Sequence, residues 1–183
     1  TKTFMRPVLA RPAGVSLALA IGAALLPAHA AQPVVVAVDG TLCDLTKTLA
    51  AGAASVTCLI PPGGDPHSYR LKPSDRSQIA KSDLVLHIGF GLTPSAKKLK
   101  SPGTVVAVGE VALPSYGGSD PHVWHDPANS AAMVRVISSS LAPVLPASDR
   151  AALQQRTARA VAVLQALQSW EAKQFSSLPP AQR

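Results

Sequence analysis

The sequence predicts an α/β fold in which a parallel four-stranded sheet with flanking helices is followed by a long α-helix. Short β-branched runs alternate with helical stretches over residues 32–108, a pattern typical of βαβ units and a parallel sheet. The loops after the strands are rich in glycine and proline, which end regular structure. An uninterrupted helical periodicity then extends from residue 149 to residue 175.

Each strand is predicted from an apolar run that ends at a turn signal. The four runs occupy residues 32–38, 55–60, 83–88 and 104–108. Between the strands, helices are predicted over residues 41–51, with Thr41 as the cap, over 73–81, with Asp75 in the first turn, and over 94–99.

The second half of the chain contains two predicted helices. Residues 131–141 form the first, which ends before Pro143 and Pro146. Ser148 caps the second, which runs from residue 149 to residue 175 and would span roughly 40 Å. This helix is longer than a small domain needs, so we expect it to reach another part of the protein.

The first 30 residues have the layout of a secretory signal peptide. Three basic residues precede an apolar run over residues 15–26, and the small-x-small triplet at residues 28–30 has the form of a cleavage site. The apolar run is shorter than the roughly 20 residues that a transmembrane helix needs. We therefore expect residues 31–183 to be exported to the periplasm, with no membrane span.

Charge and aromatic content argue against a nucleic-acid-binding protein. The chain has 17 Lys and Arg against 10 Asp and Glu, a net charge of +7. Three of the basic residues and none of the acidic ones lie in the signal, which leaves +4 for the remainder. Few aromatic side chains are available to stack on bases. No motif of a metalloprotease, serine hydrolase, P-loop or dinucleotide-binding protein is present.

The chain has two cysteines, Cys43 and Cys58, and both lie beyond the signal. In an exported protein an even pair favours a disulfide, because the compartment is oxidising. The alternative is a thiolate metal or redox site, but the spacing of the two residues differs from CxxC and neither adjoins a histidine. We predict a structural disulfide between them.

The tripeptide Asp-Pro-His occurs twice, each time shortly after a pair of glycines, and ends at His67 and at His122. Glycine lets the chain turn, and proline then fixes φ at about −65°. A histidine on such a stiff loop loses little conformational entropy when its imidazole binds a ligand. Both loops are expected at the carboxyl edge of the sheet, where ligands gather in α/β folds. We predict that His67 and His122 bind one metal ion; the alternative is that each only finishes a turn.

Other polar residues near these loops have less certain roles. His125, three residues beyond His122, is a possible third ligand. His87 lies within an apolar strand, and we expect it to be a core or strand-end residue rather than a ligand. Asp65 and Asp120 are separated from the histidines by proline, which suits hydrogen-bond acceptors or turn formers better than ligands of the same ion.

Several segments together resemble the zinc/manganese solute-binding proteins of bacterial ABC importers, the metal-binding cluster A-I family. They are residues 42–46 (LCDLT), 60–69 (IPPGGDPHSY), 73–75 (PSD) and, above all, 120–127 (DPHVWHDP). The resemblance covers nearly all of the chain beyond the signal, and a pair of histidine motifs is far more specific than a single glycine motif. Where many members have Asn-Gly after the third strand, this chain has Ile88-Gly89.

The resemblance implies two α/β lobes joined by one long rigid helix, with the metal between the lobes. It implies His67 and His122 as the ligands of the amino-terminal lobe, and a histidine and a carboxylate from the other lobe. On this basis we expect a signal peptide over residues 1–30, a metal-binding lobe over 31–146 and an interlobe helix over 147–183, with the second lobe absent. The acidic, histidine-rich loop of some zinc members is also absent.

We predict that the protein captures a divalent transition metal and delivers it to the membrane permease of an ABC transporter, without catalysing a reaction. Zinc is expected first and manganese second, because imidazole is a borderline ligand that suits zinc. The alternative is a small exported zinc-dependent hydrolase that uses His67, His122 and His125, with Asp126 as the nearest general base. A third alternative, an adhesion or scaffold module, would not depend on metal.

Overall fold

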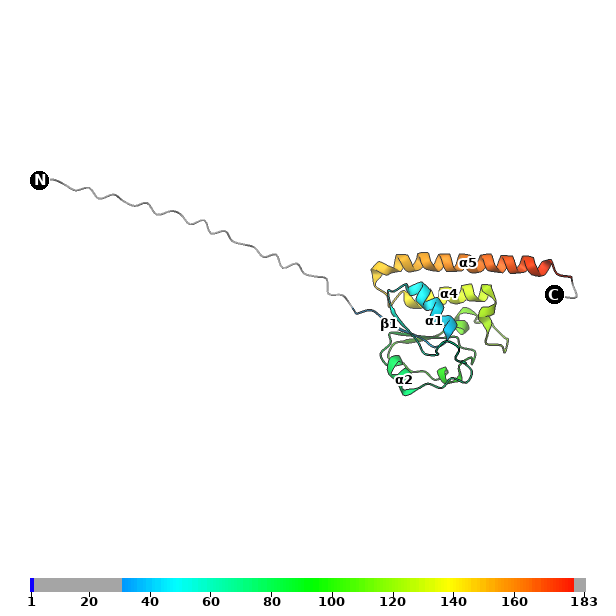
Figure 1. The fold of residues 1–183 in the computed structure, drawn as a ribbon, viewed down its shortest axis with the longest axis horizontal. Helices are drawn as coiled ribbons and strands as arrows, with labels where there is room; N and C mark the ends of the chain where they lie inside the picture. The colour runs from blue at the N-terminus through cyan, green and yellow to red at the C-terminus, as the bar shows by residue number, and fades with distance from the viewer. Residues whose placement is uncertain (2–30, 180–183) are drawn as a thin grey trace. The chain divides into compact units, whose positions relative to one another are not determined.

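In the computed structural model, which describes Thr1 and residues 31–179, four parallel strands form one sheet in the order β2-β1-β3-β4 (Figure 1). The strands are β1 (Val34–Ala37), β2 (Ser55–Cys58), β3 (Leu84–His87) and β4 (Thr104–Ala107). The chain moves from β1 to one neighbour, β2, and then to the other, β3. This reversal creates a crevice at the carboxyl ends of β1 and β3, where α/β proteins bind ligands. The predicted signal peptide lies outside the described residues, apart from Thr1.

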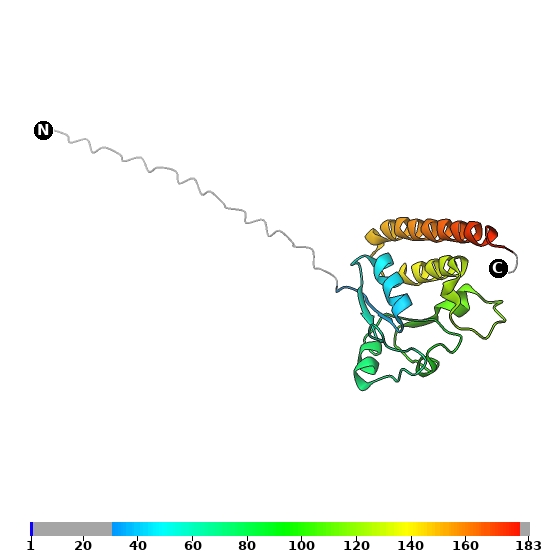
Figure 2. The ribbon, with the colours of Figure 1, turned by 45° about the vertical axis from the view of Figure 1, so that its right-hand side comes forward.

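Helices cover both faces of the sheet (Figures 1 and 2). On one face lie α1 (Gly40–Ala50) and α4 (Pro127–Leu141), and α5 (Arg150–Ser176) packs on the outer side of these two helices. The layer on the other face contains α2 (Pro73–Ile79) and the 3₁₀ turn η1 (Pro94–Ala96). Shorter elements complete the fold: α3 (Val108–Ala112), η2 (Val123–His125) and η3 (Ala147–Asp149). The predicted fold class is therefore confirmed.

Alternate residues of β1, β3 and β4 enter two separate hydrophobic clusters. Val35 and Leu84 pack in the larger cluster, toward α1 and α4, whereas Val36 and Val85 pack in the smaller one, toward α2 and η1. All four side chains are fully buried. Successive strand residues point to opposite faces, so a sheet covered on both faces needs apolar residues at consecutive positions. This requirement explains the β-branched runs that identified the strands.

The predicted cap residues of α1 and α5 were both wrong. Asp39 rather than Thr41 caps α1, because its carboxylate Oδ1 accepts from the Leu42 N–H at 3.0 Å. Ser148 does not cap α5: it lies within η3, and Asp149 occupies the cap position without a side-chain cap bond.

Two larger differences from the prediction concern helices α4 and α3. Helix α4 begins at Pro127, four residues earlier than expected, because Asp126 accepts from the Ala128 N–H at 2.7 Å and proline fits the first helical turn. Helix α3 was not predicted, since it starts at Val108, directly at the end of β4, and has five residues.

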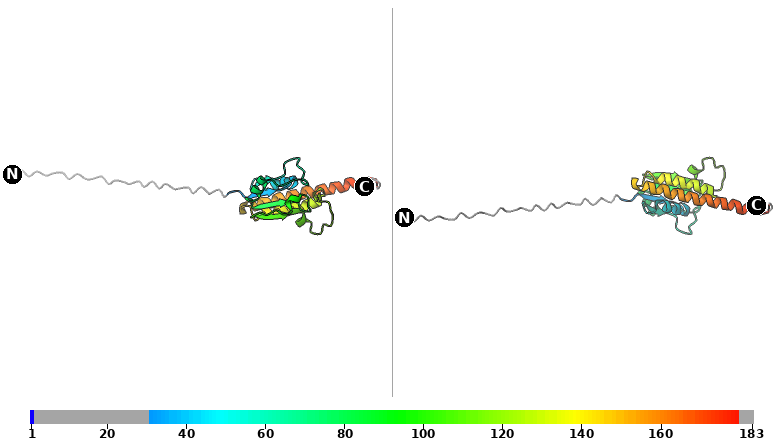
Figure 3. Two further views of the ribbon diagram at one scale, coloured as in Figure 1. Left: turned by 90° about the horizontal axis from the view of Figure 1, so that it is seen from below. Right: turned by 90° about the horizontal axis from the view of Figure 1, so that it is seen from above.

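Helix α5 runs past the edge of the layer on which it packs, as both views in Figure 3 show. Of its 27 residues, Leu153 and Val161 are buried. Leu164 still packs against the larger cluster, but Leu167 is 41% exposed and Trp170 is 59% exposed. Leu167 and Trp170 are therefore large apolar residues that the described part of the chain leaves exposed. Among the described helices, none combines the length and hydropathy needed to cross a bilayer.

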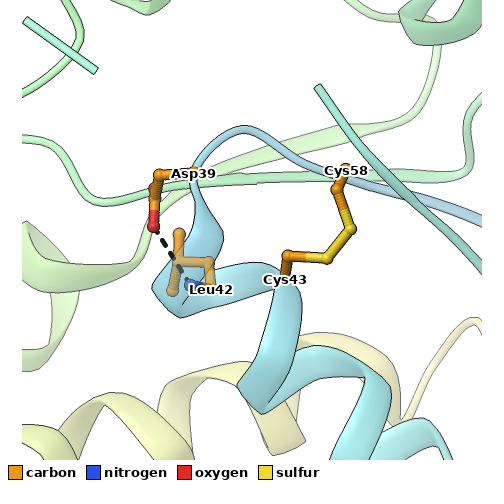
Figure 4. Close-up of a disulfide and its surroundings, with 4 residues drawn as sticks. All are labelled: Asp39, Leu42, Cys43 and Cys58. Carbon is orange, nitrogen blue, oxygen red and sulfur yellow. Dashed lines mark hydrogen bonds between the residues drawn. A yellow bond between two sulfur atoms is a disulfide. The ribbon is translucent and has the colours of Figure 1, made fainter. Parts of the chain in front are cut away.

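The predicted disulfide is present and joins α1 to the last residue of β2 (Figure 4). The Cα atoms of Cys43 and Cys58 are 5.6 Å apart, within the range for a bridge. Neither cysteine is free, so the alternative of a thiolate metal site is not supported. The bridge anchors the strand from which the first Asp-Pro-His loop leaves.

We expect the double replacement C43S/C58S to lower the free energy of unfolding by about 3 kcal/mol, because the unfolded chain regains the freedom of a loop closed over 15 residues. Urea denaturation of the oxidised protein and of the variant measures this difference. Thiol titration of the denatured, unreduced protein is the control. Two reactive thiols per chain would show that the bridge does not form.

Asp39 combines its capping role with nearly complete burial at 4% exposure (Figure 4). Its second oxygen, Oδ2, has no hydrogen-bond partner of good geometry. Burial raises the pKa of this carboxyl to about 6, and hydrogen bonds from nearby backbone N–H groups, Leu42 first, only partly offset the effect. The folded protein therefore holds a proton on Asp39 more tightly than the unfolded chain does.

This difference makes Asp39 oppose folding at neutral pH. The contribution of its protonated form to stability is complete below about pH 4 and is lost as the pH rises through about 6. Asp39→Asn keeps a capping oxygen and removes the charge, so we expect the variant to be more stable at pH 7.5 by roughly 2–3 kcal/mol. The gain should vanish toward pH 4.

Thermal unfolding of both proteins between pH 4 and pH 8 measures the effect. Asp44→Asn, an exposed carboxylate on the same helix, is the matched control. A stability gain for Asp39→Asn that does not change with pH would contradict the explanation.

Candidate metal centre

The two Asp-Pro-His loops meet at the carboxyl edge of the sheet. The first leaves β2 and the second follows β4 and α3, so they start from the two outer strands. Their histidines, 55 residues apart in sequence, have Nε2 atoms 3.0 Å apart. The ring of His67 meets the ring of His122 edge-on, with centroids separated by 5.0 Å. The structure thus brings together the two residues that the repeated tripeptide singled out.

The same local turn builds both loops. The carboxylate Oδ1 of Asp65 accepts from the His67 N–H at 3.0 Å, and Oδ1 of Asp120 accepts from the His122 N–H, also at 3.0 Å. An aspartate that accepts from the backbone two residues on mimics a backbone turn, and the intervening proline stiffens it. Both aspartates are therefore turn formers, as the sequence predicts.

The two loops differ in how the histidine ring is held. Asp120 Oδ1 lies 2.6 Å from Nδ1 of His122, so the carboxylate holds a proton on Nδ1 and leaves the lone pair on Nε2. In the first loop, Oδ2 of Asp65 accepts instead from the Ser68 hydroxyl at 2.7 Å. The neighbouring residues also differ: Ser68 follows His67, whereas the buried Val123 follows His122.

These hydrogen bonds also keep both carboxylates charged. The pKa of Asp65 is lowered mainly by the Ser68 hydroxyl, and next by the His67 N–H. The pKa of Asp120 is lowered mainly by the His122 N–H, and next by the His122 ring. Two charged carboxylates beside the histidine pair make the site attractive to a cation.

Tyr69 anchors the first loop to the body of the fold. Its hydroxyl donates to the Leu59 carbonyl at 2.9 Å and to Asp75 Oδ2 at 2.8 Å, and its own carbonyl accepts from the Ser95 hydroxyl at 2.7 Å. Burial raises the pKa of Tyr69 to about 12, with the adjacent Asp75 carboxylate adding to the effect. The first loop is therefore fixed on both sides of His67.

Helix α4 anchors the second loop through η2. Asn129 donates to the Val123 carbonyl at 3.1 Å, and the Ser130 hydroxyl donates to the Trp124 carbonyl at 2.7 Å. The ring of Trp124 stands edge-on to the ring of His122, with centroids 5.2 Å apart. His125 is exposed and its ring centroid is 6.3 Å from that of His122, so it does not join the Nε2 pair.

His87, the last residue of β3, lies in a different place. It is half-buried and lines a separate cavity of about 520 Å³ together with Thr93, Lys97 and Glu110. Burial lowers its pKa, and the charge of Glu110 opposes that shift. Within residues 31–179, no group of three or more His, Cys, Asp or Glu side chains could hold a metal ion. The described residues therefore offer a pair of imidazoles rather than a complete coordination shell.

Comparison with known proteins places the chain in a family. Residues 35–183 match the sequence model for ZnuA, the periplasmic component A of zinc-uptake complexes. The chain belongs to the ZnuA family. This result confirms the resemblance seen in the sequence.

Individual relatives of the ZnuA family support the assignment. The zinc-binding protein TroA of Treponema pallidum is 31% identical over an alignment of 162 residues that covers 83% of this chain and 52% of TroA. The manganese-binding lipoprotein MntA of Halalkalibacterium halodurans is 33% identical and covers 76% of this chain and 49% of its own length. The solved structure of periplasmic TroA superposes with a TM-score of 0.73 at 28% identity, covering 81% of this chain and 57% of that one. The chain thus spans about half the length of the curated relatives it matches.

Asp120 contacts the ring of His122, whereas Asp65 contacts Ser68. Replacing the two aspartates should therefore change zinc affinity by different amounts. Asp120→Asn keeps an oxygen for the turn but removes the charge beside Nδ1 of His122, so zinc affinity should fall about tenfold. Asp65→Asn is the matched control, because Asp65 contacts Ser68 rather than a ring, and its affinity should stay within about twofold of the parent. Isothermal titration with zinc measures both. Equal losses would contradict the proposed role of the Asp120–His122 contact.

Proposed function

We propose that this protein captures a divalent transition metal in the periplasm, zinc first, and delivers it to the permease of an ABC importer. The observation that carries the proposal is the 3.0 Å approach of Nε2 of His67 to Nε2 of His122 on two stiff, anchored loops. Export of residues 31–183 after removal of residues 1–30 is part of the same proposal.

The distance between the nitrogens fits a shared ion. Zinc–nitrogen bonds of about 2.0–2.1 Å in tetrahedral geometry separate two ligand nitrogens by roughly 3.3 Å. The observed separation of 3.0 Å needs only a small widening to admit the ion. The pair supplies two positions of four. We propose that a second lobe provides a histidine and a carboxylate for the others, with residues 31–146 as one lobe and 147–183 as the connecting helix.

Zinc is the preferred metal because the described donors are nitrogens. Manganese favours carboxylate and carbonyl oxygens, whereas imidazole suits zinc. TroA is named for zinc and MntA for manganese, so the family accommodates both. Manganese is therefore the second candidate.

The hydrolase alternative lacks a supporting observation. Catalytic zinc sites use three protein ligands and an open position for water. His125, the residue that would be the third ligand, is exposed and its ring centroid lies 6.3 Å from that of His122. The named relatives are metal-binding proteins, and metal capture without turnover is the function we propose.

Calorimetric titration of zinc into four variants tests the site. We expect His67→Ala and His122→Ala each to abolish measurable binding, because one imidazole alone holds zinc too weakly to detect at micromolar protein. The matched controls are His87→Ala, in the separate cavity, and His125→Ala, on the adjacent turn; both should bind as the parent does. Removal of zinc with a chelator should be complete and reversible.

Two results would contradict the proposal. If His67→Ala binds zinc as tightly as the parent, the two histidines do not share an ion. If His125→Ala abolishes binding, the ligand set includes a residue that the proposal leaves out, and the hydrolase geometry regains support.

A further inference from the structure

The segment between α3 and His122 is held by one tyrosine. The hydroxyl of Tyr116 donates to the backbone carbonyl of Asp120 at 2.8 Å. Asp120 is the residue whose carboxylate lies 2.6 Å from Nδ1 of His122. A bond that fixes the backbone of Asp120 therefore also fixes the carboxylate that orients the His122 ring.

Because Gly118 has no side chain, the space beside it is open for Tyr116 to reach Asp120. A Cβ at position 118 would overlap the hydroxyl and ring carbons of Tyr116. Gly118 is not among the glycines with positive φ, so what it contributes is space rather than backbone freedom. The glycine before the second Asp-Pro-His motif thus serves the tyrosine contact.

The other side of the Tyr116 ring rests on a loop that follows β3. Phe90 meets Tyr116 edge-on, with ring centroids 5.0 Å apart and planes at 62°. Such an edge-to-face pair fixes the relative orientation of the two rings. The second Asp-Pro-His loop is therefore supported by Phe90, which lies 26 residues before Tyr116 in the chain.

Phe90 is itself held in an uncommon backbone conformation. Its φ is 50°, in the left-handed region, between Gly89 at 87° and Gly91 at 74°. The Phe90 N–H donates to Oε1 of Glu110 at 2.7 Å, and a Cβ at Gly89 would come within 2.8 Å of the same carboxylate. Non-glycine residues keep a left-handed conformation only where their surroundings determine it, and such positions cluster at functional sites.

From these contacts we infer that Tyr116 is a positioning residue for metal capture: it transmits the fixed position of the Phe90 loop to Asp120, and through Asp120 to the His122 ring. The inference rests on the proposed function, because it concerns the affinity of the same site. The first loop has no equivalent, since Tyr69 donates to Leu59 and Asp75 rather than to Asp65.

Tyr116→Phe tests the inference, since it keeps the ring on Phe90 and removes only the hydroxyl. Loss of one neutral hydrogen bond should raise the zinc dissociation constant roughly three- to tenfold. In the zinc-free protein, long-range ¹H–¹⁵N spectra of the histidine rings report the proton on Nδ1 of His122. We expect that proton to exchange with solvent faster in Tyr116→Phe than in the parent.

Tyr69→Phe is the matched control, because it removes the other phenol hydroxyl of the chain from the opposite loop. It should change the His122 ring signal less than Tyr116→Phe does, because Tyr69 does not contact Asp120. Gly118→Ala should reproduce the His122 signal of Tyr116→Phe, since its methyl group displaces the tyrosine. Circular dichroism and thermal unfolding confirm that each variant is folded.

The outcomes separate this inference from the proposed function. If the parent binds no zinc, the proposed function fails and the ring signal alone decides whether Tyr116 positions His122. If Tyr116→Phe keeps both the zinc affinity and the His122 signal of the parent, the inference is overturned. It is also overturned if Tyr69→Phe changes the His122 signal equally, or if the signal changes in Tyr116→Phe without any loss of affinity.

Discussion

Parallel pairing of the four strands determines where the functional residues lie. Because β1 pairs with both β2 and β3, and β4 pairs with β3, all four carboxyl ends meet at one edge. The loops that leave the outer strands can then approach each other across the inner two. Both sheet faces are buried, and the strands pair in one register, with Val36 opposite Thr57 of β2 and Val85 of β3. His67 and His122 meet at the edge that this parallel pairing defines.

The site shows how one repeated motif gives two different surroundings. Both loops use aspartate to close the same turn, and both are anchored to a neighbouring layer: the first to α2 and η1 through Tyr69, the second to α4 through η2. The difference lies in the side-chain contacts: Asp65 Oδ2 accepts from the Ser68 hydroxyl, whereas Asp120 Oδ1 also contacts Nδ1 of the His122 ring. One loop therefore presents an oriented imidazole and the other a freer one.

Much of this arrangement could be predicted from the sequence, and the failures have physical reasons. The strands were found because burial on both faces demands continuous β-branched runs, and the histidine pair was found because its motif is repeated. The cap of α1 was missed because Asp39 and Thr41 are both good cap residues, and which of them accepts from the Leu42 N–H depends on the turn at the end of β1. The role of Tyr116 was missed because it depends on Phe90, whose distance in space no local pattern reveals.

The close approach of the two imidazoles also determines which of their ring nitrogens carry a hydrogen. With Nδ1 of His122 occupied by its proton toward Asp120, Nε2 of that ring can only accept. The 3.0 Å contact then requires His67 to donate from its own Nε2, so the two rings are joined by an N–H···N hydrogen bond rather than by two competing lone pairs. Under the proposed function, a cation could bind both nitrogens only after that hydrogen moves to Nδ1 of His67 or departs to water. Metal binding at this pair would therefore be coupled to the movement of one proton.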